Sequence, residues 1–342
     1  MRSFGALVAI VIAVFYLAAA AARADEPTQK LGEAPADLEQ ILMRGDFDRV
    51  DQLADEYRST QIRMRGGRWV LSSFYSVIAD FAGAIPACAC TVDGSSTPFE
   101  AKRKQLELWF AAKPNSLTAR VALASLWKNY ASARRGGLYA AQTTDSNWQG
   151  YHEGLARAND LVGNVDPTTD PVIFSIKMQI AVGSEDPRPQ LDDLYARAVK
   201  AFPTYVLYYS SRYRFLQERW FGQPGEAHAY LDSLLQSPGG DEGKIAYVEA
   251  ATTALDFERT PASLLSFSGV SYHRLVDAFG ARQRTVGLTD HDWNVLMYYA
   301  VAALDRNGVA FVAQKIGDHW EKALWGTKDS YERWVGWSAR AL

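Results

Sequence analysis

The stretch Leu191-Asp-Asp-Leu-Tyr-Ala-Arg-Ala-Val-Lys-Ala-Phe202-Pro203 decides the fold class of this chain. Its apolar residues recur every three or four positions, which is the spacing of one face of an α-helix. The same template fits residues 50–57, 227–235 and 309–320. Because no alternating, strand-like run of comparable length occurs, the sequence predicts an all-α protein.

Prolines divide these helical stretches at regular intervals. Pro167, Pro203 and Pro238 each follow an apolar-periodic stretch and stand 36 and 35 residues apart. This spacing is close to the roughly 34-residue helix–turn–helix unit of tetratricopeptide arrays. Since proline cannot continue a helix interior, each one predicts the boundary of a helical hairpin.

The same logic predicts how the whole chain is organised. The segment 113–116, Lys-Pro-Asn-Ser, predicts another boundary, followed by a helix from Leu117 to about Arg135. Residues 36–342 are therefore expected to form one tetratricopeptide-like array of helical hairpins (an α-α superhelix). A last helix carrying Trp334 and Trp337 is expected to cap it, as open arrays require.

Charge and composition exclude some classes of function. The 342 residues include 36 Lys+Arg and 39 Asp+Glu, a formal net charge of -3. A dedicated nucleic-acid binder needs a surplus of cations on one surface, so nucleic acid is not expected as a partner. With 48% hydrophobic and 22% charged residues, the chain has the composition of a folded protein.

The N-terminus has the features of a signal peptide. Arg2 precedes an uncharged apolar run over residues 6–22, and Ala22 and Ala24 provide small residues before a cleavage point. We expect residues 1–24 to be removed, although an uncleaved anchor is the alternative. Residues 25–35 are expected to be a flexible lead-in, and the mature protein to be periplasmic or secreted without a membrane span.

Cys88 and Cys90 lie in a segment rich in Gly, Pro and Ser, with one alanine between them. In an oxidising compartment neighbouring thiols usually pair, so the two are a disulfide candidate that would staple the loop locally. A redox-active or metal-binding pair is the alternative. Two thiolates supply only half of a tetrahedral zinc shell, however, and no histidine lies within ten residues.

Aromatic residues are abundant, and some of them are candidates for binding. The segment 202–220 places Tyr208, Arg212 and Trp220 where they would anchor a peptide or glycan on the concave face of an array. The alternative is that this aromatic stripe packs helices together. Arg134 and Arg135 precede Gly136, which favours a role at a helix C-terminus, but they would also suit an anion-binding patch.

Catalytic constellations are not evident. The five histidines form no His-Glu-x-x-His pair, and Ser125-Leu-Trp-Lys128 lacks the other elements of penicillin-binding enzymes. Asp292 follows Thr289, a plausible N-cap, and is more simply an anion in the first turn of a helix. We therefore predict no catalytic residue, no metal site and no cofactor.

Several short motifs occur in a fixed order along the chain: Arg68-Trp69, Phe74-Tyr75, Leu106 to Trp109, Lys113 to Ser116, Arg135-Gly136, Arg219 to Gln223, Gly240 to Tyr247, and the tail from Tyr298 to Trp337. In this order they resemble an exported bacterial family known as domain of unknown function 4034. The resemblance implies a tetratricopeptide-like helical domain in an exported bacterial protein. It implies no reaction and no cofactor.

These observations favour an exported scaffold that binds a protein, peptide or glycan of the cell envelope on its concave face without transforming it. The alternative is a secreted α/α-barrel polysaccharide hydrolase or lyase, which needs a pair of carboxylates or a Tyr/His base at the barrel centre. For that activity the clusters to examine are Asp241 with Glu242 and His291 with Asp292. A third class is a thiol-active protein working through Cys88 and Cys90.

Overall fold

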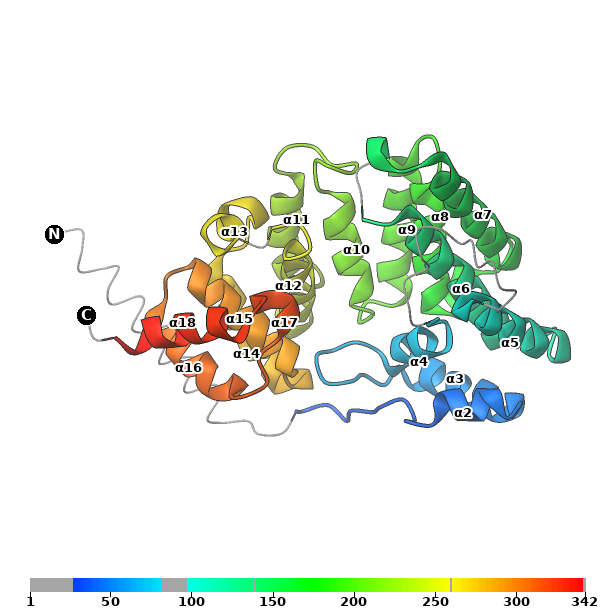
Figure 1. Cartoon of the computed structure of the whole chain (residues 1–342), viewed down its shortest axis with the longest axis horizontal. Helices are drawn as coiled ribbons and strands as arrows, with labels where there is room; N and C mark the ends of the chain where they lie inside the picture. Colours follow the sequence, from blue (N-terminus) through cyan, green and yellow to red (C-terminus); the bar gives the residue numbers. More distant parts are fainter. Residues whose placement is uncertain (1–26, 82–96, 138–139, 259, 341–342) are drawn as a thin grey trace. The chain divides into compact units, whose positions relative to one another are not determined.

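A computed structural model describes most of the chain, namely residues 27–81, 97–137, 140–258 and 260–340 (Figure 1). Within these residues the regular structure is helical, which confirms the all-α class. Their only strand-like feature is an isolated bridge between Leu31 and Arg63. None of the helices in this described part is long and apolar enough to span a bilayer.

The contacts between residues divide the chain into two compact units. The N-terminal unit comprises Gly32–Ile62 and Trp69–Tyr205, and the C-terminal unit comprises residues 27–31, 63–68 and 206–340. The sequence did not indicate this division. A single array over residues 36–342 and its tetratricopeptide-like order stay predictions.

The N-terminal unit is built around one long helix, α6, which contacts five of its neighbours. Its boundaries agree with the sequence, because α6 spans Leu117–Arg135 and its N-cap Ser116 accepts a hydrogen bond from the Ala119 amide. The helices of this unit are α2 (Leu38–Met43), α3 (Phe47–Thr60), α4 (Val70–Ile78), α5 (Pro98–Ala112), α6, α7 (Asp145–Val162), α8 (Pro171–Val182) and α9 (Pro187–Ala201), with single 3-10 turns η1 (Ala140–Gln142) and η2 (Pro167–Thr169).

A buried ion pair ties four of these helices together. Asp170 is fully buried and accepts hydrogen bonds from Arg58 Nε and from the Tyr75 hydroxyl, both at 2.9 Å. Its other oxygen caps α8 by accepting from the Val172 amide at 2.8 Å. Arg58 also donates to Thr118 of α6. One carboxylate thus links α3, α4, α6 and α8.

The C-terminal unit is organised around α12, which contacts α10, α11, α13 and α14. Residues 295–301 of α15 are all buried. The closing helix, α18, packs on α16 and α17. The helices are α10 (Leu207–Phe215), α11 (Glu226–Leu234), α12 (Gly240–Ala254), α13 (Pro261–Ser268), α14 (Tyr272–Val286), α15 (Asp290–Ala302), α16 (Arg306–Ile316), α17 (Lys322–Trp325) and α18 (Lys328–Ala339), with a short π-type segment η3 (Leu235–Gly239).

The six-residue segment Arg63–Arg68 belongs to the C-terminal unit, although the segments on either side of it belong to the N-terminal unit. Arg63 is buried and pairs with Glu242 at 2.7 Å, while Arg68 pairs with buried Glu249 at 3.0 Å. Arg282 of α14 contacts Glu249 as well, at 3.2 Å. Arginine–carboxylate pairs at both ends of the segment 63–68 therefore bind it to α12.

The expected turns are confirmed where the structure describes them. Pro203 lies between α9 and α10, Pro167 opens the short turn η2 between α7 and α8, and Pro238 lies within η3 between α11 and α12. In the turn from α2 to α3, Gly45 has a φ of 76° and Asp46 caps α3 by accepting from the Arg49 amide. A positive φ favours glycine, so this turn follows directly from the local sequence.

The lead-in has partners that the sequence did not indicate. The amides of Thr28 and Gln29 donate to the carbonyls of Arg284 and Thr285, at 2.9 and 3.2 Å. The flexibility of residues 25–35 stays a prediction. The predicted signal peptide, residues 1–24, lies outside the described residues.

Candidate functional site

The candidate site depends on an unusually close approach of two helices. A Cβ atom on Gly154 of α7 would lie 2.8 Å from the Trp127 carbonyl of α6, which is shorter than real Cβ contacts. Only glycine fits at this position without a backbone shift. The approach brings the side chains around Trp127 next to those of α7.

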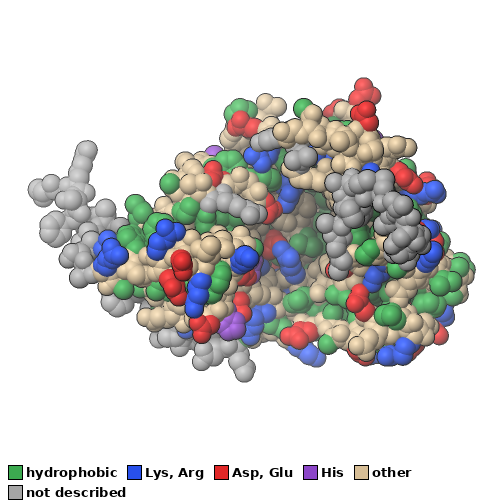
Figure 2. Space-filling view, in the orientation of Figure 1, with side chains coloured by type: hydrophobic (Ala, Val, Ile, Leu, Met, Phe, Trp, Pro, Cys, Tyr) green, Lys and Arg blue, Asp and Glu red, His purple; other side chains and the backbone are tan. Residues whose placement is uncertain are grey.

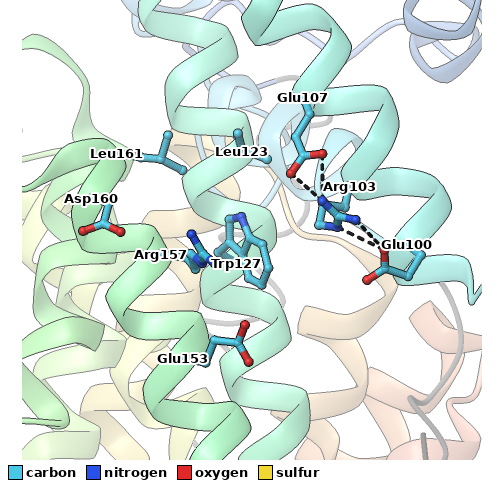
Figure 3. Close-up of a pocket in the computed structure, with 9 residues that line it drawn as sticks. All are labelled: Glu100, Arg103, Glu107, Leu123, Trp127, Glu153, Arg157, Asp160 and Leu161. Atoms are coloured by element: carbon cyan, nitrogen blue, oxygen red, sulfur yellow. Dashed lines mark hydrogen bonds and ion pairs between the residues drawn. The ribbon is translucent and has the colours of Figure 1, made fainter. Parts of the chain in front are cut away.

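A pocket of about 460 Å³ lies here, within the N-terminal unit (Figure 3). Three helices contribute one face each, at the spacing of successive helical turns. The lining residues are Glu100, Arg103 and Glu107 of α5, Leu123 and Trp127 of α6, and Glu153, Arg157, Asp160 and Leu161 of α7.

On α5, the positive charge is already neutralised. Arg103 donates to Glu100 at 2.6 and 3.1 Å and to Glu107 at 2.7 and 2.8 Å (Figure 3). Its hydrogen bonds to Glu100 and then those to Glu107 raise the pKa of the Arg103 guanidinium. Arg103 is therefore held in place between two carboxylates.

On α7, the carboxylates are free of such pairing. Figure 3 shows Arg157 beside the Trp127 indole, with its guanidinium carbon 5.9 Å from the ring centroid. No hydrogen bond or ion pair joins Glu153 or Asp160 to another lining residue. Both carboxylates are exposed, and Arg157 lies between them on the same face of α7, so these three groups carry a formal charge of -1.

The Trp127 ring is fixed by other aromatic rings. Phe99 lies edge-on at 5.2 Å and Tyr130 at 5.6 Å. Burial raises the pKa of Tyr130, and although Arg134 lowers it, Glu153 and Glu100 raise it further. The aromatic cluster therefore lies within electrostatic range of Arg134 as well as of these two carboxylates.

The lining residues determine what the groove can bind. They carry four carboxylates and two guanidinium groups, a formal charge of -2. Carboxylates beside an aromatic ring attract an ammonium or guanidinium group, and the guanidinium of Arg157 already lies over the Trp127 ring. In the described part of the chain, no three His, Cys, Asp or Glu residues are placed to hold a metal ion.

The predicted anchors on α10 have different environments. Tyr208 is only 1% exposed, so the prediction of a surface anchor at this residue is wrong: its ring is in the core, as the packing alternative expects. Arg212 is partly buried and interacts within the chain. Trp220 lies beyond the end of α10 and is 38% exposed, which leaves it available to a ligand.

Arg134 and Arg135 make contacts at the end of α6. Arg134 donates to the Ser146 carbonyl and Arg135 to the Thr143 hydroxyl, both at 2.9 Å. The Arg135 guanidinium also lies 4.8 Å from the Trp148 ring centroid. These contacts fix the entry to α7, as a role at the helix C-terminus predicts, and an anion-binding role stays a prediction.

The clusters considered for catalysis have structural partners. Asp241 pairs with Arg284, Glu242 with Arg63, and His291 with Glu321. Asp292 forms the predicted cap at the start of α15, a capping box with Thr289. Cys88 and Cys90 lie outside the described residues, so their pairing stays a prediction.

Compared with known protein families, curated proteins and solved structures, the chain matches none. The resemblance to domain of unknown function 4034 is therefore neither supported nor contradicted, and it stays a prediction.

The sequence analysis did not predict this groove. The only trace of the groove in the sequence is a stripe of charged residues on each of two amphipathic helices, Glu100–Arg103–Glu107 and Glu153–Arg157–Asp160. Such stripes are ordinary for solvent-exposed helix faces. Only the packing of α5, α6 and α7 shows that the two stripes flank the same tryptophan.

Proposed function

We propose that the protein is an exported, non-catalytic helical scaffold whose α5–α6–α7 groove binds a basic segment of a partner protein or peptide. The single observation that carries the proposal is the exposed pair Glu153 and Asp160 beside the Trp127 indole, two carboxylates that form no ion pair with another lining residue. A lysine or arginine of the partner would place its cation beside Glu153 and Asp160, next to the ring over which Arg157 already lies. Of the protein, peptide and glycan considered from the sequence, the charge of this groove favours the peptide.

The interaction free energies expected at the groove are those of a reversible complex. A cation over an exposed aromatic face contributes about 0.5–1 kcal/mol. Each exposed ion pair adds a similar amount and weakens with salt. A single basic residue is therefore bound weakly, and a segment with several basic residues would be needed for a stable complex.

The surface is compatible with charge-selective binding. Figure 2 shows acidic and basic side chains interspersed over the visible face. Recognition therefore depends on local clusters such as the groove. The formal net charge of -3 gives only a mild general attraction for cations.

The test is fluorescence anisotropy of a labelled Lys/Arg-rich peptide with the mature chain, residues 25–342. We expect the E153Q/D160N double variant to weaken binding about tenfold, which corresponds to about 1.4 kcal/mol. Trp127→Phe should weaken it less, because a smaller aromatic face remains. Binding should also weaken as salt is raised.

The matched control is E185Q/D186N. Both residues are exposed, belong to the same unit and lie away from the groove lining, and the variant removes the same two charges. It should leave affinity within about twofold. Equal weakening by both double variants would show non-specific attraction to an acidic protein and refute the groove as the site.

Export is part of the same proposal and rests on the pattern of residues 1–24. Mass spectrometry of protein recovered from a bacterial host should give a chain that begins at Asp25. Recovery of the chain with residues 1–24 intact in the membrane fraction would support the anchor alternative.

A further inference from the structure

A rigid turn in the C-terminal unit connects α10 to α11 at residues 216–225. The Trp220 amide donates to the Gln217 carbonyl at 2.8 Å, and the Gly222 amide donates to the same carbonyl at 3.2 Å. A Cβ atom on Gly222 would lie 1.9 Å from the Leu216 carbonyl oxygen, so only glycine permits this conformation. The backbone around Trp220 is therefore fixed by its own packing.

This turn presents a large aromatic side chain to solvent. Large hydrophobic side chains that are substantially exposed in the described residues are few, and Trp220 is the only aromatic one among them. The neighbouring Arg219 is held over the Phe257 ring, 4.9 Å from its centroid. An exposed tryptophan on a rigid turn loses little conformational freedom when a ligand stacks on it.

A pocket of about 390 Å³ lies where this turn meets the start of α11 and the end of α13. Its uncharged polar side chains are Gln217, Gln223, His228 and Ser266, and its only full charges, Glu218 and Arg219, cancel formally. Leu216 and Phe267 contribute apolar surface.

The histidine has a defined role in this lining. The Phe267 carbonyl can only accept, so the His228 Nε2, 3.0 Å away, is the donor. In the neutral ring this leaves Nδ1 as an acceptor. The pocket thus combines amide donors and acceptors, a hydroxyl and an imidazole ring.

We propose that this pocket binds a pyranose unit of a neutral oligosaccharide. Trp220 does not line the pocket but directly follows the lining residue Arg219, and it would stack on the adjoining sugar unit of the same oligosaccharide. Sugar hydroxyls both donate and accept, which matches the amide and hydroxyl groups of the lining. The C–H face of a pyranose is apolar and suits an indole. A formally neutral lining gives no preference for an anionic or cationic ligand, in contrast to the acidic groove around Trp127.

The site is independent of the peptide groove, because it belongs to the other unit and uses other residues. Sugar binding should therefore be insensitive to salt and unchanged in the E153Q/D160N variant. Peptide binding should in turn be unchanged by substitution of Trp220. A negative result for sugar binding therefore does not contradict the proposed peptide binding, and the reverse also holds.

The experiment uses the mature chain with three neutral probes: maltohexaose, cellohexaose and N-acetyl-chitohexaose. Isothermal titration calorimetry and saturation-transfer NMR should show saturable binding of at least one of them. Trp220→Ala should weaken it at least tenfold, and Ser266→Ala by about threefold, the size expected for one hydrogen bond. Trp220→Phe should retain part of the affinity.

Leu304→Ala is the matched control, because Leu304 is a 69% exposed apolar residue of the same unit that does not line the pocket. It should bind the sugar like the parent chain. Absence of saturable binding of all three probes up to about 10 mM, a ceiling that corresponds to negligible affinity, would overturn the proposal. Unchanged binding by Trp220→Ala, with the same circular dichroism as the parent, would overturn it as well.

Discussion

Each unit buries carboxylates against arginine, and Asp170 in the N-terminal unit and Glu249 in the C-terminal unit have opposite pKa shifts. In the N-terminal unit, Asp170 contacts one guanidinium, that of Arg58. In the C-terminal unit, Glu249 contacts two, those of Arg68 and Arg282. Both carboxylates are inaccessible to solvent or nearly so.

The pKa values of the two carboxylates shift in opposite directions. Burial raises the pKa of Asp170, and the single Arg58 only partly opposes it. Burial acts in the same direction on Glu249, but Arg68 and Arg282 together bring its pKa below the ordinary value of 4.5. Burial alone therefore does not tell whether a carboxylate prefers its charged form.

The largest effect is expected from Asp170→Ala. The substitution leaves the Arg58 guanidinium, in a side chain only 14% exposed, without its buried partner and removes the cap of α8. Breaking a buried pair in this way costs about 3–5 kcal/mol. Chemical denaturation of parent and variant measures the loss.

Asp55→Ala is the control for that experiment. Asp55 pairs with the same arginine, but its side chain is 72% exposed. Removing an exposed partner costs about 0–1 kcal/mol. Equal losses in the two variants would show that burial of the pair is not what stabilises this unit.

A smaller loss is expected where two helices approach most closely. Gly154→Ala places a Cβ atom 2.8 Å from the Trp127 carbonyl oxygen, so α7 must shift away from α6. Overpacking of this kind costs about 1–3 kcal/mol. It should also weaken peptide binding at the groove, which anisotropy reports in the same sample.

Gly336→Ala on α18 is the matched control, since a Cβ atom there would have no neighbour within 4 Å. In an exposed helix interior, replacing glycine by alanine stabilises by up to about 1 kcal/mol. The two substitutions should therefore change the melting temperature in opposite directions. A stabilising Gly154→Ala would contradict the described packing of α6 and α7.

The pH dependence of stability should separate the two carboxylates. The pKa of Glu249 is lowered in the fold, so its contribution is present above about pH 4.5 and is lost as the pH falls through its folded pKa. The pKa of Asp170 is raised, so its contribution is present below about pH 3.8 and is lost as the pH rises through its folded pKa.

Substitutions of Glu249 and Asp170 should change the pH dependence of the unfolding free energy in opposite directions. Between pH 5 and pH 3, Glu249→Gln should lose less stability than the parent chain, and Asp170→Asn should lose more, by on the order of 1 kcal/mol in each case. Urea denaturation at several pH values gives both slopes. The same change of slope in both variants would contradict the opposite shifts.

The smallest effect concerns helix caps, which also differ between the units. The Ser116 hydroxyl caps α6, whereas Ser271 at the start of α14 makes no capping hydrogen bond through its side chain. Ser116→Ala should cost about 0.5–1 kcal/mol and Ser271→Ala close to nothing. A loss of comparable size at Ser271 would mean that the serine side chain acts through the unfolded state rather than through the cap.

Local features of the fold were predictable because they depend on neighbouring residues. The segment 113–116 separates α5 from α6, and Thr289 with Asp292 caps α15, each as its sequence predicts. Capping, glycine conformation and proline geometry act within a few residues. They can therefore be read without knowledge of the tertiary structure.

The candidate sites were predictable only in part. Trp220 was identified as an anchor and is exposed, but Tyr208 from the same stripe is buried. Aromatic residues at helical spacing serve packing and binding alike, so their spacing cannot assign one role. Trp127 was not identified at all, because its carboxylate neighbours lie on other helices.

The sequence by itself determined the helical class, the positions of the turns and the caps, since these follow from interactions between residues close along the chain. Tertiary structure alone decided which charges meet: Arg58 and Asp170 are 112 residues apart, and Arg68 and Glu249 are 181 apart. The pKa of a buried carboxylate depends on how many cations surround it, and the groove around Trp127 depends on three helix faces meeting. Both are properties of the packed chain, because the groups concerned are separated in sequence and come together only on folding.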